Sequence, residues 1–491
     1  MGTQHKTCLP GTREPIMNEI RQWGKNPNVE KRAFWLRDVA GSGKSTVALT
    51  MCEEWDDTPN FLVGRFFFSK NARNTSETDA FCSVVAEDIG SKSEEIMQKV
   101  QSAKQKDPHL IDRRLRHQFA KLIEEPLKLA NDDVVIVIDA LDECKKEMRG
   151  ALLRFLLEKL SSMPKVRLFI TSRPEPDIAA ILQDRAIARG MNFDMHGKNE
   201  RTNLEDITTY VDAHLTKLLT TTQRQQLIER SNGLFIWITT ASLELQQVQG
   251  PEAINATLQS LLTKGKGGDA NQVYAGVLRR LIREQHPDVI YKVLGTILIL
   301  FEPVSTEALA KLTNIAQPEL EHILTSMQSV FCVDNAVEFI HLTFREYLVG
   351  AHNSEMPFDF TTVQSALAIS VLNILQEDLK EDICGIYQPD QPYPKLVDVL
   401  DLNERLQRVW NSSPALPYLA KYWSSHIVPV AANENVAKVL RGFLETRILH
   451  FIELVCLMGQ MHLFRNLEEA RRGFGYQRSN SVEAEVRSHG A

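Results

Sequence analysis

The stretch from Ala33 to Thr46, AFWLRDVAGSGKST, decides the fold. It opens with an apolar and aromatic run that predicts a buried strand, and it ends in the glycine-rich core Gly41-Ser-Gly-Lys-Ser-Thr46. A helical pattern follows directly, from Ser45 to Trp55. In this strand–loop–helix order, glycines let backbone N–H groups face a phosphate at the start of a helix. The stretch therefore predicts a phosphate-binding loop.

Each position of this loop has an expected role. We assign nucleotide contacts to Ala40, Gly41, Ser42, Gly43, Lys44, Ser45 and Thr46. Lys44 would bridge the β- and γ-phosphates, and the Ser45 hydroxyl would ligate Mg²⁺. The first glycine of the pattern G-x-x-x-x-G-K-[ST] is replaced by Asp38, whose carboxylate is expected to weaken binding. The alternative is a glycine-rich turn that happens to contain Lys and Ser, and the flanking strand and helix argue against it.

A second motif lies almost a hundred residues later, at Val134 to Glu143, VVIVIDALDE. A buried strand that ends in an acid suits Mg²⁺, which Asp139 would hold through water. Asp142 and Glu143 are placed to orient or deprotonate an attacking water, so we assign them catalytic roles. Acids in this position can also cap the next helix, which is the alternative interpretation.

A third buried strand ends in LFITSRP, residues 168–174, and delivers Arg173 to the same edge of a sheet. Ligands of open α/β sheets collect at the carboxyl ends of the strands. Arg173 is therefore predicted to sense the γ-phosphate as a catalytic residue. The alternative is an ion pair with Glu175 or Asp177 within its own loop.

The whole pattern predicts an α/β P-loop NTPase with a mostly parallel sheet, followed by a mostly helical half. Strands are expected at 33–39, 62–69, 133–140 and 166–172, and helices at 45–55, 81–89, 115–129 and 148–160. After about residue 200 the strand pattern nearly vanishes, apart from a hairpin at 330–342. Capping boxes are expected at Thr202–Glu205 and Thr343–Glu346.

Composition excludes several other classes of protein. The formal net charge of −7 argues against binding to nucleic acid. The seven cysteines lack C-x-x-C spacing and indicate reduced thiols, and no histidine spacing predicts a metal other than Mg²⁺. The longest apolar run, Val293 to Phe301, is too short to span a bilayer. A cytoplasmic location is expected.

Together these residues resemble the NACHT group of STAND NTPases, especially the fungal receptors that are similar to animal NOD-like receptors. The resemblance rests on seven segments in the family's order: CLPGTREPIMNEIRQW, FWLRDVAGSGKST, RFFFSKN, VVIVIDALDEC, RLFITSRPEP, SNGLFIWITTAS and FIHLTFREYL. It implies an N-terminal linker at 1–32, a NACHT NTPase domain at 33–198, a small helical domain at 199–265, a winged-helix-like domain at 266–352, a C-terminal helical domain at 353–465 and a disordered tail at 466–491. No effector domain or repeat array is expected in these residues.

The resemblance also implies a mechanism. The family switches between an ADP-bound closed form and an ATP-bound form that opens and oligomerises, and slow hydrolysis resets it. His341, in the H-x-x-F corner that ends at Phe344, would bind the β-phosphate of ADP in the closed form. The alternative is that the His341 side chain forms hydrogen bonds only with its own backbone. Phe235 stands where many relatives have an adenine-contacting proline, so the preference for adenine follows from the family alone.

Three hypotheses of function follow. The first is a slow Mg²⁺-dependent ATPase whose nucleotide state gates self-association in fungal-type innate immunity or incompatibility. The second is a scaffold that binds nucleotide without hydrolysing it, which Asp38 favours. The third, a small-molecule kinase, is disfavoured because Asp142 and Glu143 suit water activation better.

Overall fold

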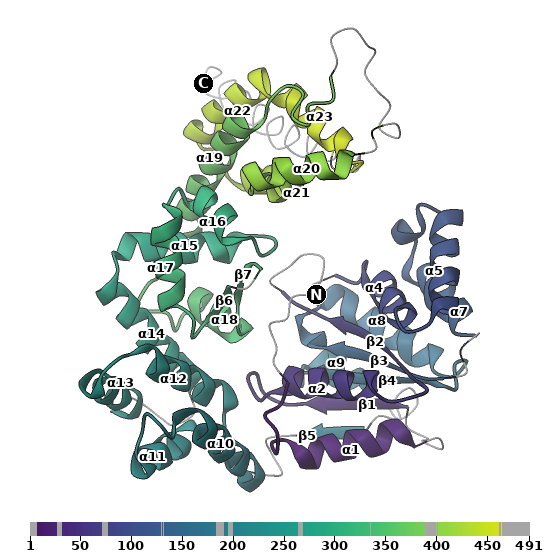
Figure 1. Ribbon diagram of the computed structural model, residues 1–491, viewed down its shortest axis with the longest axis vertical. Coiled ribbons are helices and arrows are strands. Elements are labelled where there is room, and N and C mark those ends of the chain that lie inside the picture. Colours follow the sequence, from purple (N-terminus) through teal and green to yellow (C-terminus); the bar gives the residue numbers. More distant parts are fainter. Residues whose placement is uncertain are drawn as a thin grey trace, which may run out of the picture. The chain divides into compact units, whose positions relative to one another are not determined.

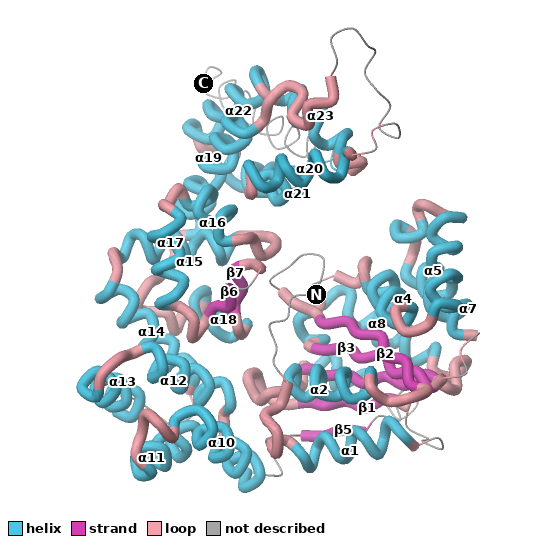
Figure 2. The backbone as a smooth tube through the Cα atoms, viewed as in Figure 1, coloured by secondary structure: helices cyan, strands magenta, loops and turns pink. Residues whose placement is uncertain are grey.

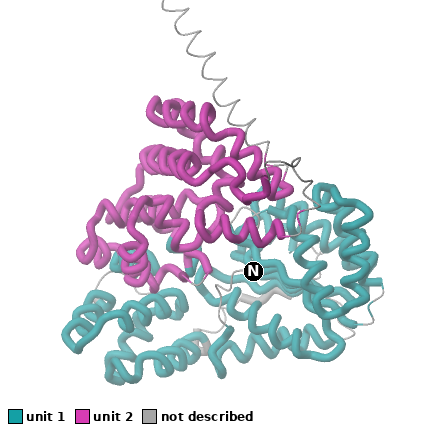
Figure 3. The backbone as a smooth tube through the Cα atoms, turned by 45° about the horizontal axis from the view of Figure 1, so that its top comes forward, with its two compact units in different colours: residues 1–277, 340–344 teal, residues 278–339, 345–491 magenta. Residues whose placement is uncertain are grey.

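A computed structural model describes residues 7–26, 32–70, 77–128, 130, 132–182, 191–194, 200–263, 269–333, 335–387, 399, 401–460 and 463. The chain divides into two compact units (Figure 3). The first contains residues 1–277 and 340–344, and the second contains residues 278–339 and 345–491. The tail expected at 466–491 lies outside the described residues.

A five-stranded parallel sheet forms the centre of the first unit (Figures 1 and 2). The strands lie in the order β2-β3-β4-β1-β5, with bounds β1 Ala33–Arg37, β2 Phe61–Phe67, β3 Asp133–Asp139, β4 Val166–Ser172 and β5 Met191–Asp194. Because β4 lies between β1 and β3, the loops that follow these three strands meet at one edge of the sheet. The prediction of an α/β fold with a parallel sheet is confirmed.

Helices cover both faces of this sheet (Figure 1). On one face, α1 (Glu14–Lys25) and α2 (Lys44–Asp56) pack with alternate residues of the strands, such as Phe34 and Phe169. The opposite face carries α4 Phe81–Gly90, α5 Glu94–Lys106, α8 Lys146–Lys159 and α9 Pro176–Leu182. Both hydrophobic clusters are buried, which explains why the strands show apolar runs without alternation.

The prediction of a single helix at 115–129 is wrong in detail. The structure has α6 at Leu115–Phe119, a π-helical turn at Ala120–Glu124 and α7 at Glu125–Leu127, after a short 3₁₀ turn at Leu110–Asp112. Pro126 lies in α7 and has no backbone N–H, so the regular hydrogen-bond pattern cannot continue through it. Such π-bulges are a known way to absorb a break in the helical pattern.

The first unit continues as a helical bundle with its own hydrophobic cluster, which includes Trp237 and Leu245. Its helices are α10 Glu200–Leu215, α11 Thr221–Ser231, α12 Phe235–Gln247, α13 Pro251–Thr263 and the start of α14 Ala270–Glu284.

The capping box expected at Thr202 is wrong, because α10 already begins at Glu200. A capping box occurs one helix later, where the Thr220 hydroxyl accepts from the Gln223 N–H and the Gln223 side chain accepts from the Thr220 N–H. The sequence TTTQ carries the same pattern of hydroxyl and amide three residues apart.

The second unit is mostly helical. Its elements are α15 Pro287–Ile299, α16 Thr306–Thr313, α17 Gln317–Ser326, β6 Phe331–Val333, β7 Val337–Phe339, most of α18 Leu342–Val349, α19 Phe360–Asp378, α20 Leu402–Ser412, α21 Leu416–Ile427, α22 Glu434–Thr446 and α23 Ile448–Leu457. The antiparallel pair β6–β7 confirms the expected hairpin. Within the described residues, no helix is both long enough and apolar enough to cross a bilayer.

Candidate functional site

A cavity of about 110 Å³ lies in the first unit, where the loops after β1, β3 and β4 meet. Its lining residues are Ala40, Gly41, Gly43, Lys44, Ser45, Thr46, Phe68, Ser69, Ala140, Asp142, Glu143, Thr171, Arg173, Ile236, Ile340, His341, Leu342 and Thr343. All of the predicted site residues except Ser42 and Asp139 line it. Whole-ligand pockets usually exceed about 300 Å³, so this cavity has the size of a phosphate group rather than of an entire nucleotide.

The glycine-rich loop takes the conformation that its sequence predicts. Gly41 and Gly43 have φ of 74° and 95°, a region that glycine enters without strain. No side chain caps the N-terminus of α2, which leaves the first N–H groups of the helix for a ligand. The Gly41 carbonyl accepts a hydrogen bond from the Ile236 N–H at 3.0 Å, and a Cβ on Gly41 would lie 2.3 Å from the Ile236 side chain. Only glycine fits at this position while α12 packs against the loop.

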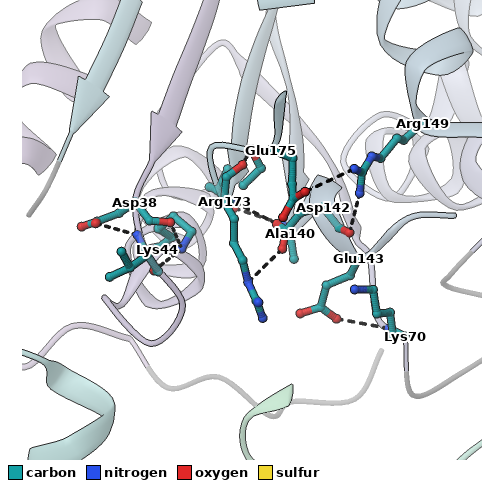
Figure 4. Close-up of polar contacts among 12 residues, drawn as sticks. Asp38, Lys44, Lys70, Ala140, Asp142, Glu143, Arg149, Arg173 and Glu175 are labelled. Atoms are coloured by element: carbon teal, nitrogen blue, oxygen red, sulfur yellow. Dashed lines mark hydrogen bonds and ion pairs between the residues drawn. The ribbon is translucent and has the colours of Figure 1, made fainter. Parts of the chain in front are cut away.

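The Lys44 side chain is fixed by backbone carbonyls of its own loop. Its ammonium donates to the carbonyls of Asp38 and Val39, at 3.0 and 2.8 Å (Figure 4). Its side chain is buried, and burial lowers the pKa of Lys44, while the charges of Asp142 and Asp38 oppose that shift. An ammonium has three donors, so one remains for an anion in the cavity.

The carboxylate of Asp38 does not line the cavity. Its Oδ1 accepts from the Val39 N–H at 2.6 Å, and Figure 4 shows it directed away from Lys44. The left-handed φ values of this loop fall on Gly41 and Gly43, and Asp38 has none. The replacement of the first glycine therefore neither strains the backbone nor puts a negative charge into the cavity in this conformation.

The acidic motif is bent sharply at the end of β3. Ala140 has a φ of 52°, and a 3₁₀ turn, Leu141–Glu143, follows it. This bend brings Asp142 and Glu143 into the lining of the cavity. Asp139 stays buried outside it, and its carboxylate accepts a hydrogen bond from the Thr171 hydroxyl, which does line the cavity.

Glu143 has an unusual environment for a carboxyl group. Its Oε2 accepts from the Lys70 N–H at 3.2 Å. Burial, together with the charge of Asp142, raises the pKa of Glu143 to about 8. A carboxyl group with a pKa near the working pH is well matched to taking a proton from water.

This shift predicts a pH profile for ATP hydrolysis. A general base must be ionised, so kcat/KM should rise with pH, up to tenfold per pH unit, and level off above about 8. The profile of kcat/KM reports the free protein, whose pKa this is. Steady-state rates measured between about pH 6.5 and 9.5 test it, with Glu143→Gln as the control expected to lose this inflection. A flat profile over this range, or an inflection that Glu143→Gln retains, would show that Glu143 is not the group that titrates.

Arg173 pairs with the acidic turn, and the two acids that the sequence offered as alternative partners, Glu175 and Asp177, pair with Arg149. The Nε of Arg173 lies 3.2 Å from Asp142 Oδ2, and the Arg173 backbone N–H donates to Asp142 Oδ1 at 3.0 Å (Figure 4). The guanidinium of Arg173 thus lines the cavity next to the acidic turn.

His341 lies between the end of β7 and the start of α18, and it lines the same cavity as Lys44. The corner is fixed to α14, since the hydroxyls of Thr343 and Tyr274 are 2.7 Å apart and the rings of Phe344 and Tyr274 are 5.0 Å apart. The cap expected at Thr343 is wrong, because α18 begins at Leu342 and the Thr343 hydroxyl bonds to Tyr274. The expected strand-to-helix corner is confirmed.

Arg13 was missed by sequence reasoning. It is a buried arginine with φ of 61°, and its guanidinium donates to the Ser42 carbonyl at 2.6 Å. The same guanidinium lies 4.5 Å from the centre of the Phe235 ring, and the Arg13 N–H donates to Asp206. Ser42 and Phe235 are therefore both held by the segment that precedes α1.

The donor set fits a magnesium-bound nucleotide. The Ser45 hydroxyl and the Asp142 carboxylate line the cavity together with the Lys44 ammonium and the start of α2. In the described part of the chain, no three His, Cys, Asp or Glu side chains are grouped so as to hold a metal alone. Mg²⁺ in nucleotide sites takes most of its ligands from phosphate and water, so one or two protein oxygens are enough.

Comparison with models of protein families finds a match over part of the chain. Residues 11–173 match the model of the family described as "Nephrocystin 3, N-terminal". No curated protein matches this sequence significantly.

Three solved structures illustrate the similarity of fold. A Walker-type ATPase of Pyrococcus abyssi matches with 12% identity and a TM-score of 0.39, covering 70% of this chain and 98% of that chain. A STAND protein with a tetratricopeptide repeat sensor from Pyrococcus horikoshii matches with 13% identity and a TM-score of 0.45, covering 99% and 67%. Cdc6p from Pyrobaculum aerophilum matches with 12% identity and a TM-score of 0.37, covering 76% and 96%.

These scores are low, so the assignment rests on the family match and on the sheet and loop described above. The matched residues run from the segment before α1 to Arg173 and include the phosphate-binding loop, the acidic turn and four of the five strands. Residues 11–173 are therefore similar to this family over about a third of the chain, and their sheet and glycine-rich loop have the fold of a P-loop NTPase.

Proposed function

We propose that this chain is an ATP/ADP-binding signalling switch of the NACHT type, in which slow Mg²⁺-dependent hydrolysis of ATP gates self-association. The proposal includes a role in fungal-type innate immunity or incompatibility and a cytoplasmic location. All seven cysteines are free thiols, as is usual in a reducing compartment. The predicted domain boundaries, and the expectation that nucleic acid is not a partner, belong to the same proposal.

One observation carries this proposal. A single cavity gathers the Lys44 ammonium, the acidic pair Asp142 and Glu143, the Arg173 guanidinium and the His341 imidazole. These groups come from four separate stretches of the chain. Cations and N–H donors on one side and acids on the other suit a phosphate group with an attacking water.

Each of these residues has its own role in the hydrolysis of ATP. Lys44 and the N-terminus of α2 bind the phosphates. The Ser45 hydroxyl and the Asp142 carboxylate would hold Mg²⁺, with Asp139 behind them acting through water, and the ion would neutralise phosphate charge. Glu143 takes the proton of the water. Asp142 holds Arg173 at the edge of the cavity, where a guanidinium can stabilise charge on the phosphate.

The scaffold without hydrolysis keeps little support from the structure. Its basis was Asp38, and that carboxylate is turned to the Val39 N–H outside the cavity. A raised pKa at Glu143 favours a catalytic base over a purely structural acid.

Two measurements on purified protein test the proposed function. The nucleotide that co-purifies is expected to be ADP, identified by chromatography after denaturation. Single-turnover hydrolysis of radiolabelled ATP should then give slow, Mg²⁺-dependent release of phosphate. Bound ADP without any hydrolysis would instead support the scaffold, and the absence of bound or exchangeable nucleotide would contradict both.

The position of His341 gives a further prediction, that His341→Leu speeds the release of ADP. A hydrogen bond to a charged group such as a phosphate is worth about 1.5–3 kcal/mol, so its loss should raise the off-rate about ten- to a hundredfold. The fraction of oligomeric protein without ligand should rise as well, because the closed form loses a contact. Stopped-flow release of fluorescent ADP and size-exclusion chromatography measure the two effects.

The matched control is His352→Leu, which removes an exposed histidine that does not line the cavity. It should leave the ADP off-rate and the elution profile unchanged. If His341→Leu behaves like this control, His341 takes no part in holding the nucleotide.

A further inference from the structure

A buried arginine lies behind the cavity, on α8. Arg149 is 6% exposed and does not line the cavity. Its Nε and Nη2 donate to the two carboxylate oxygens of Asp177, at 2.8 and 2.7 Å. Its Nη1 donates to the Asp142 carbonyl at 2.8 Å, and Figure 4 shows Arg149 next to Asp142. A planar guanidinium that binds one carboxylate with two bonds and a carbonyl with a third is fixed in direction as well as in place.

The partners of Arg149 belong to the two segments that carry Glu143 and Arg173, and they include Glu175, whose Oε2 lies 3.8 Å from Arg149 Nη2. Asp142 lies in the acidic turn Leu141–Glu143, directly before Glu143. Asp177 lies in the first turn of α9, four residues after Arg173. The two loops also meet at the front, where the Asp142 carboxylate accepts from the N–H and lies 3.2 Å from the Nε of Arg173.

We propose that Arg149 is a positioning residue for hydrolysis, which clamps the acidic turn to the Arg173 loop and so aligns Glu143 and Arg173 in the cavity. The inference rests on the proposed function, since it deepens the account of the same site. Its physical basis is that a displacement of about 1 Å in a reacting group can lower a rate by about a hundredfold.

The clamp stays charged under working conditions. The hydrogen bonds from Arg149 lower the pKa of Asp177, and the carboxylate raises the pKa of Arg149 in return. Neither group titrates near neutral pH, so the clamp holds the two loops in the same way while Glu143 gains or loses its proton.

The chain contains a matched control at the other end of the sheet. Arg167, near the start of β4, is also buried, with Nη1 3.0 Å from Asp133 Oδ1 and Nη2 donating to the Asn26 carbonyl at 3.0 Å. Like Arg149, it donates hydrogen bonds to one carboxylate and one carbonyl, and it does not line the cavity. A purely structural role for Arg149 would make the two arginines equivalent.

The experiment compares Arg149→Met with Arg167→Met. Both are expected to lower the melting temperature, because each removes the hydrogen bonds and the ion pair of a buried guanidinium. Only Arg149→Met should lower kcat, by about a hundredfold, with the Kd for ATP changed less than about threefold. Amide hydrogen exchange adds a readout without catalysis, since loss of the clamp should speed exchange of the Arg173 N–H, which donates to Asp142.

Asp177→Asn provides a second variant in case Arg149→Met fails to fold. It removes one arm of the clamp at a partly exposed residue, and it should lower kcat less than Arg149→Met does. In the double variant the two losses should not add, because both act on one contact.

The outcomes separate the two proposals. Equal effects of Arg149→Met and Arg167→Met on kcat, or unchanged exchange at Arg173, would overturn the positioning role while leaving hydrolysis established. A wild-type protein that hydrolyses no ATP would overturn the proposed function and with it the role of the clamp in hydrolysis. Faster exchange at Arg173 would in that case show only that Arg149 holds the acidic turn.

Discussion

Lys44→Ala is expected to remove nucleotide binding. The Lys44 ammonium is the one cation of the glycine-rich loop, and its carbonyl partners hold it at the cavity. A ligand present at a hundredfold excess over its Kd stabilises the native state by about 2.7 kcal/mol. ATP or ADP should therefore raise the melting temperature of the wild-type protein and leave that of Lys44→Ala unchanged, as measured by differential scanning fluorimetry.

The control for this result is Lys159→Ala. Lys159 is a lysine of α8 that pairs with Glu124 and does not line the cavity. Its loss should leave the shift produced by nucleotide intact. Equal shifts in wild-type and Lys44→Ala protein would mean that nucleotide binds elsewhere, and the assignment of the loop would be wrong.

Glu143→Gln is expected to keep the affinity for ATP and to slow its hydrolysis. Loss of a positioned base typically lowers a rate by 10²–10⁴-fold, which corresponds to about 3–5 kcal/mol of barrier. The amide keeps the size of the side chain and can still accept from the Lys70 N–H. Single-turnover hydrolysis, with affinity measured by fluorescent ATP, tests the prediction, and analytical ultracentrifugation should show an assembled state that persists with ATP.

Asp142→Asn distinguishes the roles of the two acids. Asp142 contacts Arg173 through its carboxylate, so its loss should disturb Arg173 while Glu143 remains able to take a proton. The loss of rate should therefore be smaller than that of Glu143→Gln. If Asp142→Asn causes the larger loss, the roles of base and positioning acid are exchanged.

The sequence predicts the strands of the sheet well where the apolar runs are continuous. β3 and β4 are buried along most of their length. Their continuous apolar sequences are typical of strands in a parallel sheet that is covered on both faces. β5 was missed, because its four residues, MNFD, form a strand only through pairing with β1. α5 was missed because only Ile96 and Val100 of its thirteen residues are buried.

The residues of the site also divide into those that a local motif predicts and those that it does not. The loop, the acidic turn and Arg173 could be found because each motif is short and lies next to its own strand. The contacts of Arg13 and Arg149 could not, since Asp206 lies 193 residues from Arg13 and Asp177 lies 28 residues from Arg149. Pairs of this kind depend on the folded arrangement of the elements, which no local pattern records.

The contact of Gly41 with Ile236 has a consequence for variation among relatives. The Ile236 side chain fills the space where a Cβ on Gly41 would lie, and its N–H holds the Gly41 carbonyl. The two positions therefore share one volume, although they lie far apart in the chain. We expect them to covary: a relative with a larger residue at the first should carry a smaller one at the second, and a change at either alone should be rare.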